Sequence, residues 1–115
     1  MTNHEDPEVY YSSIEERFLA RDGVQLGRSF TSPGLAYHDT IFALNSEAGL
    51  VVRVGADAAE QAITEEHGLP YRSSRFHVSP SWLLVPFSAE DPQRWAHYVD
   101  IAYTYARSHS RDDDR

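Results

Sequence analysis

The stretch that decides the fold is residues 24–55, VQLGRSFTSPGLAYHDTIFALNSEAGLVVRVG. Four short apolar runs, at residues 24–30, 35–37, 40–44 and 50–54, are separated by turns rich in Ser, Pro, Gly, Asp and Asn. Strands joined by so few residues favour antiparallel pairing, because a parallel pair needs a long crossover connection. The stretch therefore predicts an antiparallel meander of four strands.

A helix is predicted on the N-terminal side of the meander. The tripeptide Asp6-Pro7-Glu8 combines an N-cap, a proline at the first helical position and an acid in the first turn. Apolar residues at positions 11, 14 and 18 recur at helical spacing, and Asp22-Gly23 marks the end.

Three further elements are predicted on the C-terminal side. A short helix over residues 57–66 is followed by an irregular segment over 71–81 and by a fifth strand over 82–87. The continuous apolar run of that strand favours a central position, and Pro86 indicates its end or an edge. Asp91-Pro92 opens a last helix that runs to about Ser108.

The predicted fold class is α+β, an antiparallel sheet of about five strands with helices packed on it, in the order α-β-β-β-β-α-β-α. The 115 residues fit one domain, residues 1–115, with a loose leader at 1–6 and a charged tail at 109–115.

Composition narrows the class of protein. The chain has no cysteine, which excludes disulfides, thiolate metal sites and cysteine nucleophiles. Its net charge of −8 repels nucleic acid and anionic membranes unless a local patch overrides the mean. The first ten residues lack the basic and apolar regions of a signal peptide, and no apolar run approaches the roughly 18 residues of a membrane span. A cytoplasmic protein without a membrane partner is predicted.

Several strings, spread over residues 9–108, carry a resemblance to a known family. They are Arg28–Tyr37 (RSFTSPGLAY), Leu50–Gly55 (LVVRVG), Leu69–Arg72 (LPYR), Ser81–Pro86 (SWLLVP) and Ala102–Arg107 (AYTYAR). In these strings and their order the chain resembles the N-terminal domain of the TfoX/Sxy competence regulators, and more remotely the MmcQ/YjbR-like proteins. It departs from the family pattern at Ser29-Phe30-Thr31, where a Met-Phe-Gly turn is usual, and at Val78-Ser79-Pro80, where Arg-Pro-Met is usual.

The resemblance implies an α+β domain used in regulation or binding, with no cofactor and no reaction. Distant relatives are described as possible DNA-binding proteins. Full-length competence regulators carry a second, helical domain, so the resemblance covers their N-terminal domain alone.

No motif in the sequence points to catalysis or to a metal. There is no Gly-x-Ser-x-Gly elbow, no phosphate-binding glycine motif and no His-x3-His pair. His97 and Asp100 are three residues apart in the last helix, where an exposed surface pair is expected. We predict no catalytic residue, no cofactor and no metal site.

Residues 68–87 are distinctive because they contain no acidic residue. Arg72, Arg75, Tyr71 and Trp82 lie in this segment, and Arg53 in the preceding strand, together with Arg28, is expected to enlarge the same surface. Such a mixture fits a structural loop, a protein or self-association interface rich in Arg and aromatics, or a surface that stacks bases and clamps phosphates.

The sequence therefore predicts a non-catalytic regulatory or protein-interaction module, with a protein partner or self-association. A nucleic-acid-binding protein that uses the Arg and aromatic residues is the first alternative, and a small-molecule enzyme or ligand-binding protein is the second.

Overall fold

The structure is a computed structural model, and it describes residues 7–29, 32–38, 40–46, 48–72, 78–88 and 90–109. Its elements in chain order are α1 (Pro7–Leu19), β1 (Val24–Ser29), β2 (Ser32–Tyr37), β3 (Thr40–Ser46), β4 (Gly49–Arg53), α2 (Ala56–Thr64), β5 (Leu69–Arg72), β6 (Val78–Val85) and α3 (Gln93–His109).

The strands form one six-stranded sheet in the order β1-β2-β3-β4-β6-β5, and neighbours pair antiparallel. The predicted α+β class, the antiparallel sheet and the approximate order of elements are confirmed, with one strand more than expected. Strand β6 lies between β4 and β5, as its apolar run predicted, and it ends at Val85, directly before Pro86.

The additional strand is β5, which the sequence presented as the stop of a helix and the start of an irregular segment. Proline has no backbone N–H, which argues against a central strand. Because β5 is an edge strand of only four residues, Pro70 is compatible with it. Tyr71-Arg72 and residues 78–81 are therefore strand residues, and residues 73–77 lie outside the described ranges.

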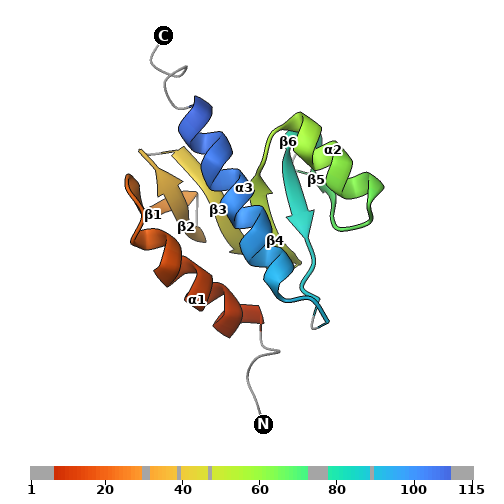
Figure 1. Cartoon of the computed structure of the whole chain (residues 1–115). Coiled ribbons are helices and arrows are strands. Elements are labelled where there is room, and N and C mark those ends of the chain that lie inside the picture. The colour runs from red at the N-terminus through yellow and green to blue at the C-terminus, as the bar shows by residue number, and fades with distance from the viewer. Residues whose placement is uncertain are drawn as a thin grey trace.

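All three helices cover the same face of the sheet. Figure 1 shows α3 crossing in front of the sheet with α1 beside it, and α2 packs on β6 and β5. One hydrophobic core joins the helices to the strands, and its largest fully buried side chains are Trp95, Phe18 and Phe42. The indole Nε1 of Trp95 donates a hydrogen bond of 2.9 Å to the carbonyl of Val85, which ties α3 to the end of β6.

A β-bulge in β3 changes which residues face the core. Leu35 pairs with Ala43, whereas Ala36 pairs with Ile41, so Phe42 is an extra residue in the pairing. Phe42 and Ala43 are consequently both buried in the core, although they are neighbours in one strand.

Gly55 allows the chain to turn from β4 into α2. Its φ of 96° is a conformation that L side chains rarely adopt, and a Cβ there would lie 2.7 Å from Cε1 of Tyr105. A side chain at this position would therefore strain the backbone and displace an aromatic ring of α3.

Candidate binding surfaces on the two sides of the sheet

The face of the sheet turned away from the helices carries a continuous apolar surface, which we call the open face. In β4, Leu50 and Val52 point into the core, so Val51 points to the opposite side. Its cross-strand partners are Leu44 and Leu84. Extending this register across the sheet gives the apolar residues of the open face as Ala36, Ile41, Leu44, Val51, Leu69, Trp82 and Leu84.

Two glycines let Ile41 lie flat on this surface. A Cβ on Gly27 would be 2.9 Å from Cδ1 of Ile41, and a Cβ on Gly34 would be 3.3 Å from its Cγ2. These strand glycines therefore have a packing role, because side chains there would lift Ile41 off the sheet.

The structure brings three of the predicted site residues together on the open face. Arg53 and Trp82 are cross-strand neighbours, and the rings of Trp82 and Tyr71 have centroids 6.2 Å apart. The guanidinium carbon of Arg53 lies 5.3 Å from the ring centroid of Tyr105, which anchors the arginine at the end of the sheet.

The other predicted residues do not join this group in the described structure. Arg28 belongs to β1, three strand spacings from β4, or about 14 Å across the sheet. The two positions are therefore not neighbours in the sheet, because β2 and β3 separate their strands. The side chain of Arg28 lies outside the described residues, so its share in the same surface stays a prediction. Arg72 belongs to β5 and pairs through its backbone with Val78, while its side chain and the whole of Arg75 lie outside the described residues.

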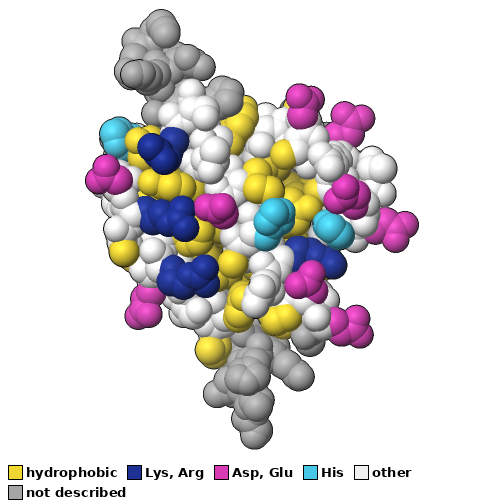
Figure 2. All heavy atoms as spheres, viewed as in Figure 1, with side chains coloured by type: hydrophobic (Ala, Val, Ile, Leu, Met, Phe, Trp, Pro, Cys, Tyr) yellow, Lys and Arg dark blue, Asp and Glu magenta, His cyan; other side chains and the backbone are white. Residues whose placement is uncertain are grey.

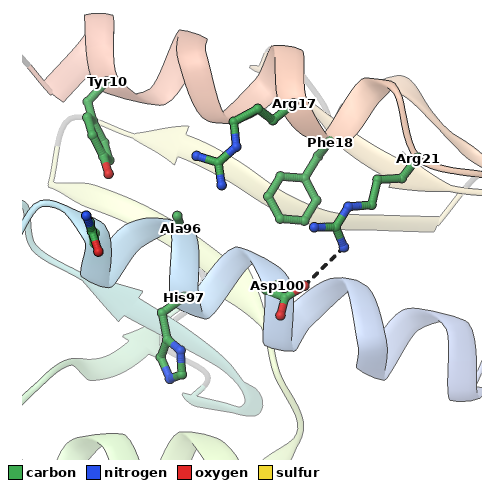
Figure 3. A pocket seen from close by; sticks show the side chains of 8 residues that line it. Tyr10, Arg17, Phe18, Arg21, Ala96, His97 and Asp100 are labelled. Carbon is green, nitrogen blue, oxygen red and sulfur yellow. Dashed lines mark hydrogen bonds and ion pairs between the residues drawn. The ribbon is translucent and has the colours of Figure 1, made fainter.

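On the helix side, a groove of about 460 Å³ runs between α1 and α3. Its lining residues are Tyr10, Arg17, Phe18, Arg21, Gln93, Ala96, His97 and Asp100. Figure 3 shows the Arg17 guanidinium turned towards α3, between Tyr10 and Phe18, with the small side chain of Ala96 opposite. The groove is open in the middle because alanine leaves space where α3 faces Arg17.

Arg17 and Arg21 line this groove, and Arg107 lies beyond its end, next to Arg21 on the ring of Tyr103; we call these three residues the arginine row. Arg21 forms an ion pair of 3.1 Å with Asp100 and stacks over the ring of Phe18. The guanidinium carbons of Arg21 and Arg107 lie 5.2 and 5.5 Å from the ring centroid of Tyr103. Figure 2 shows basic side chains gathered in a column on this side of the molecule.

Arg17 differs from Arg21 because it has no ion pair within the described part of the chain. Asp100 is the acid among the groove's lining residues, and Arg21 neutralises it. The arginine row thus keeps a local positive charge on a chain whose net charge is −8.

The sequence contained part of the signal for this groove. Arg17 and Arg21 are four residues apart, which places them on one side of a helical turn. The missing part is tertiary, because Arg107 comes from α3, and only the packing of α3 beside α1 aligns it with the other two.

A comparison with protein families shows which family the chain belongs to. A family model described as the TfoX N-terminal domain matches residues 16–106. The chain belongs to the TfoX N-terminal domain family. No curated protein and no solved structure matched the chain. The resemblance predicted from the strand and helix strings is therefore confirmed, and it supports a regulatory or competence-related domain.

In this TfoX N-terminal domain a second hollow, of about 360 Å³, lies beside the start of α3. Its polar lining residues are Glu66, His67, Ser88 and Arg94, and the remaining lining residues are apolar or glycine. Asp91 lies 3.5 Å from Arg94, and the Tyr98 hydroxyl lies 3.1 Å from Nδ1 of His67. The charge of Arg94 is thus already countered by Asp91, whereas Arg17 in the groove has no such ion pair in the described structure, so this hollow offers less to an anionic ligand than the groove does.

His97 and Asp100, which the sequence predicted as an exposed surface pair, have different surroundings. Figure 3 shows His97 turned away from α1, and Asp100 is engaged by Arg21. Within the described ranges no group of three His, Asp or Glu side chains could hold a metal ion. No helix in those ranges is both long and apolar enough to cross a bilayer.

Proposed function

We propose that this TfoX N-terminal domain is a non-catalytic regulatory module that binds an acidic segment of a partner protein in the groove between α1 and α3. The observation that carries the proposal is Arg17, a cation directed into an open groove without an ion-pair partner in the described structure. Family membership supports the regulatory role. The absence of cysteine supports a cytoplasmic setting.

The chemistry of the groove favours a peptide that is acidic and partly apolar. Tyr10 is a partly exposed aromatic residue beside Arg17, and Arg with aromatic residues is a common composition of protein interfaces. The groove lining follows α3 from Gln93 to Asp100, about 10 Å of helix. A peptide that also reaches Arg107 spans about 21 Å of α3, or about six extended residues.

A protein partner fits this surface better than nucleic acid, the alternative predicted from the sequence. The arginine row is short, and Figure 2 shows acidic side chains around the same side of the molecule. A duplex would extend beyond the row over these acids, whereas a short peptide meets only the local positive charge.

The test is fluorescence anisotropy with a labelled peptide rich in Glu and Leu. Truncating two arginines with the double substitution Arg17→Ala and Arg107→Ala should weaken binding at least about tenfold, since two charge-assisted contacts are lost. Arg53→Ala is the matched control, because it removes an arginine outside the groove, and it should leave the affinity unchanged.

Two results would contradict the proposed groove. One is equal binding of the peptide by the double variant and the wild type. The other is equal binding of a peptide in which Gln replaces every Glu. If labelled single-stranded DNA binds more tightly than the acidic peptide, with a steep loss as salt rises, the nucleic-acid alternative takes its place.

A further inference from the structure

We infer that the open face of the sheet is a self-association surface, on which a second copy of this chain packs face to face about a twofold axis. This inference is independent of the peptide groove, because the open face lies on the other side of the sheet from α1 and α3 and uses different residues.

The distribution of charge is the first argument. The chain contains 18 acidic residues, yet none of the residues in its six described strands is Asp or Glu. The acids with described positions belong to the helices and to the turns. Two copies that meet through their open faces therefore keep their negative charges apart, although each carries −8.

The second argument is the amount of apolar side chain on this face. When helices cover one face of an antiparallel sheet, the other face is commonly polar and solvated. Here Ile41, Leu44, Trp82 and Leu84 are only half-buried, and Leu69 is 50% exposed. Val51 and Ala36 are themselves only 1% exposed, so the apolar area open to a partner is that of these five residues. Partly exposed apolar side chains gathered on one face are typical of an interaction site.

The dimensions fit a dimer. With strands about 4.8 Å apart and about 3.3 Å per residue, six strands and the seven-residue β3 give a face of roughly 29 by 23 Å. Two such outlines in full contact would cover on the order of 1,300 Å² together, close to the lower limit of about 1,200 Å² for a specific interface. Two sheets pack in this manner about 10 Å apart.

The chemistry of the face favours a second copy over other occupants. Arg53 is the cation whose described side chain starts from this face, and its guanidinium stacks on Tyr105 of α3 at the end of the sheet. Nucleic acid requires a series of cations along its backbone, and a partner selected by charge would find little to contact. An apolar face without acids matches itself under a twofold axis.

Sedimentation velocity over a range of protein concentrations tests the inference. Wild type should approach twice the 13.1 kDa mass of the chain as its concentration rises. Leu69→Glu places a charge on the open face and should raise the dimer Kd at least about tenfold. Val9→Glu is the matched control, since Val9 is 48% exposed on α1, and it should leave the Kd unchanged.

A second measurement requires no substitution. Trp95 is 1% exposed and Trp82 is half-buried on the open face, so acrylamide quenching reports mainly on Trp82. Quenching should decrease as concentration rises. A wild type that stays monomeric up to about 1 mM, the weak end of the affinity scale, would overturn the inference, as would a dimer that Val9→Glu disrupts as strongly as Leu69→Glu does.

Discussion

Two buried tyrosine hydroxyls have opposite circumstances in this domain. Tyr11 is 6% exposed, and its hydroxyl has no hydrogen-bond partner within the described part of the chain. Burial raises the pKa of Tyr11 well above its ordinary 10.0, and the charge of Glu15 raises it further. The hydroxyl of Tyr98, in contrast, lies 3.1 Å from Nδ1 of His67.

Removing each hydroxyl should therefore change stability in opposite directions. Tyr11→Phe deletes an unpaired buried group and should raise the free energy of unfolding by up to about 1 kcal/mol, whereas Tyr98→Phe should lower it by about 1 kcal/mol. Urea denaturation at neutral pH measures both. A clear loss of stability in Tyr11→Phe would show that its hydroxyl has a partner.

The same substitution affects stability at high pH. Because the folded pKa of Tyr11 is raised, its contribution is fully present below the unfolded pKa of 10.0 and is lost as pH rises above it. Between pH 10 and about 12 the wild type should therefore lose more unfolding free energy than Tyr11→Phe does.

At the scale of elements, α3 is attached to the sheet through Trp95. This side chain is fully buried, and its hydrogen bond to the Val85 carbonyl holds the point where β6 ends. This buried side chain and its hydrogen bond fix the position of α3, the longest helix, on the sheet. They thereby also fix one wall of the groove.

Trp95→Phe should lower the free energy of unfolding by about 2–4 kcal/mol, because it leaves a cavity and an unpaired carbonyl. Trp82→Phe is the matched control, since Trp82 is half-buried on the open face, and it should cost less than about 1 kcal/mol. Thermal unfolding followed by circular dichroism compares them. Equal losses would mean that Trp95 contributes no more than an ordinary surface aromatic.

The sequence predicted those elements whose signals are local. Asp6-Pro7-Glu8 marked the start of α1, which begins at Pro7, and the apolar run over 82–87 identified the internal strand β6. Strand β5 was missed because Pro70 is a local stop signal, and only pairing with β6 makes those residues a strand. The β3 bulge, which buries Phe42 and Ala43 together, also depends on a partner strand.

The candidate surfaces, too, could be predicted only where their sequence signal is local. The acid-free segment pointed to Tyr71 and Trp82, which the sheet does bring together. The groove was missed because its two walls come from distant segments: the paired residues Arg21 and Asp100 are 79 positions apart, and spacing along one helix cannot reveal that alignment.

In the whole molecule, the acidic residues with described positions and the strands of the sheet occupy different places. The acids with described positions lie on the helices and turns, and the strands contain none. The two proposed surfaces therefore differ in how salt affects them. Screening weakens the attraction between the arginine row and an acidic peptide, but it also reduces the repulsion between two chains of −8.

Raising salt from about 50 to about 500 mM should weaken peptide binding and strengthen self-association in one preparation. Anisotropy and sedimentation velocity measure the two affinities under identical buffers. The same direction of change at both surfaces would mean that at least one of them is governed by charges other than those described.

The short strand β5 also limits what such an assembly can become. With four residues, a proline at Pro70 and a register shift beside it, β5 presents few free N–H groups to a strand from another molecule. Growth of the sheet past β5 into a filament is thereby disfavoured, while the stacking that we infer through the open face would close after two copies. A protein whose strands contain so many uncharged residues could in this way form a finite complex and still resist polymerisation at the β5 edge of its sheet.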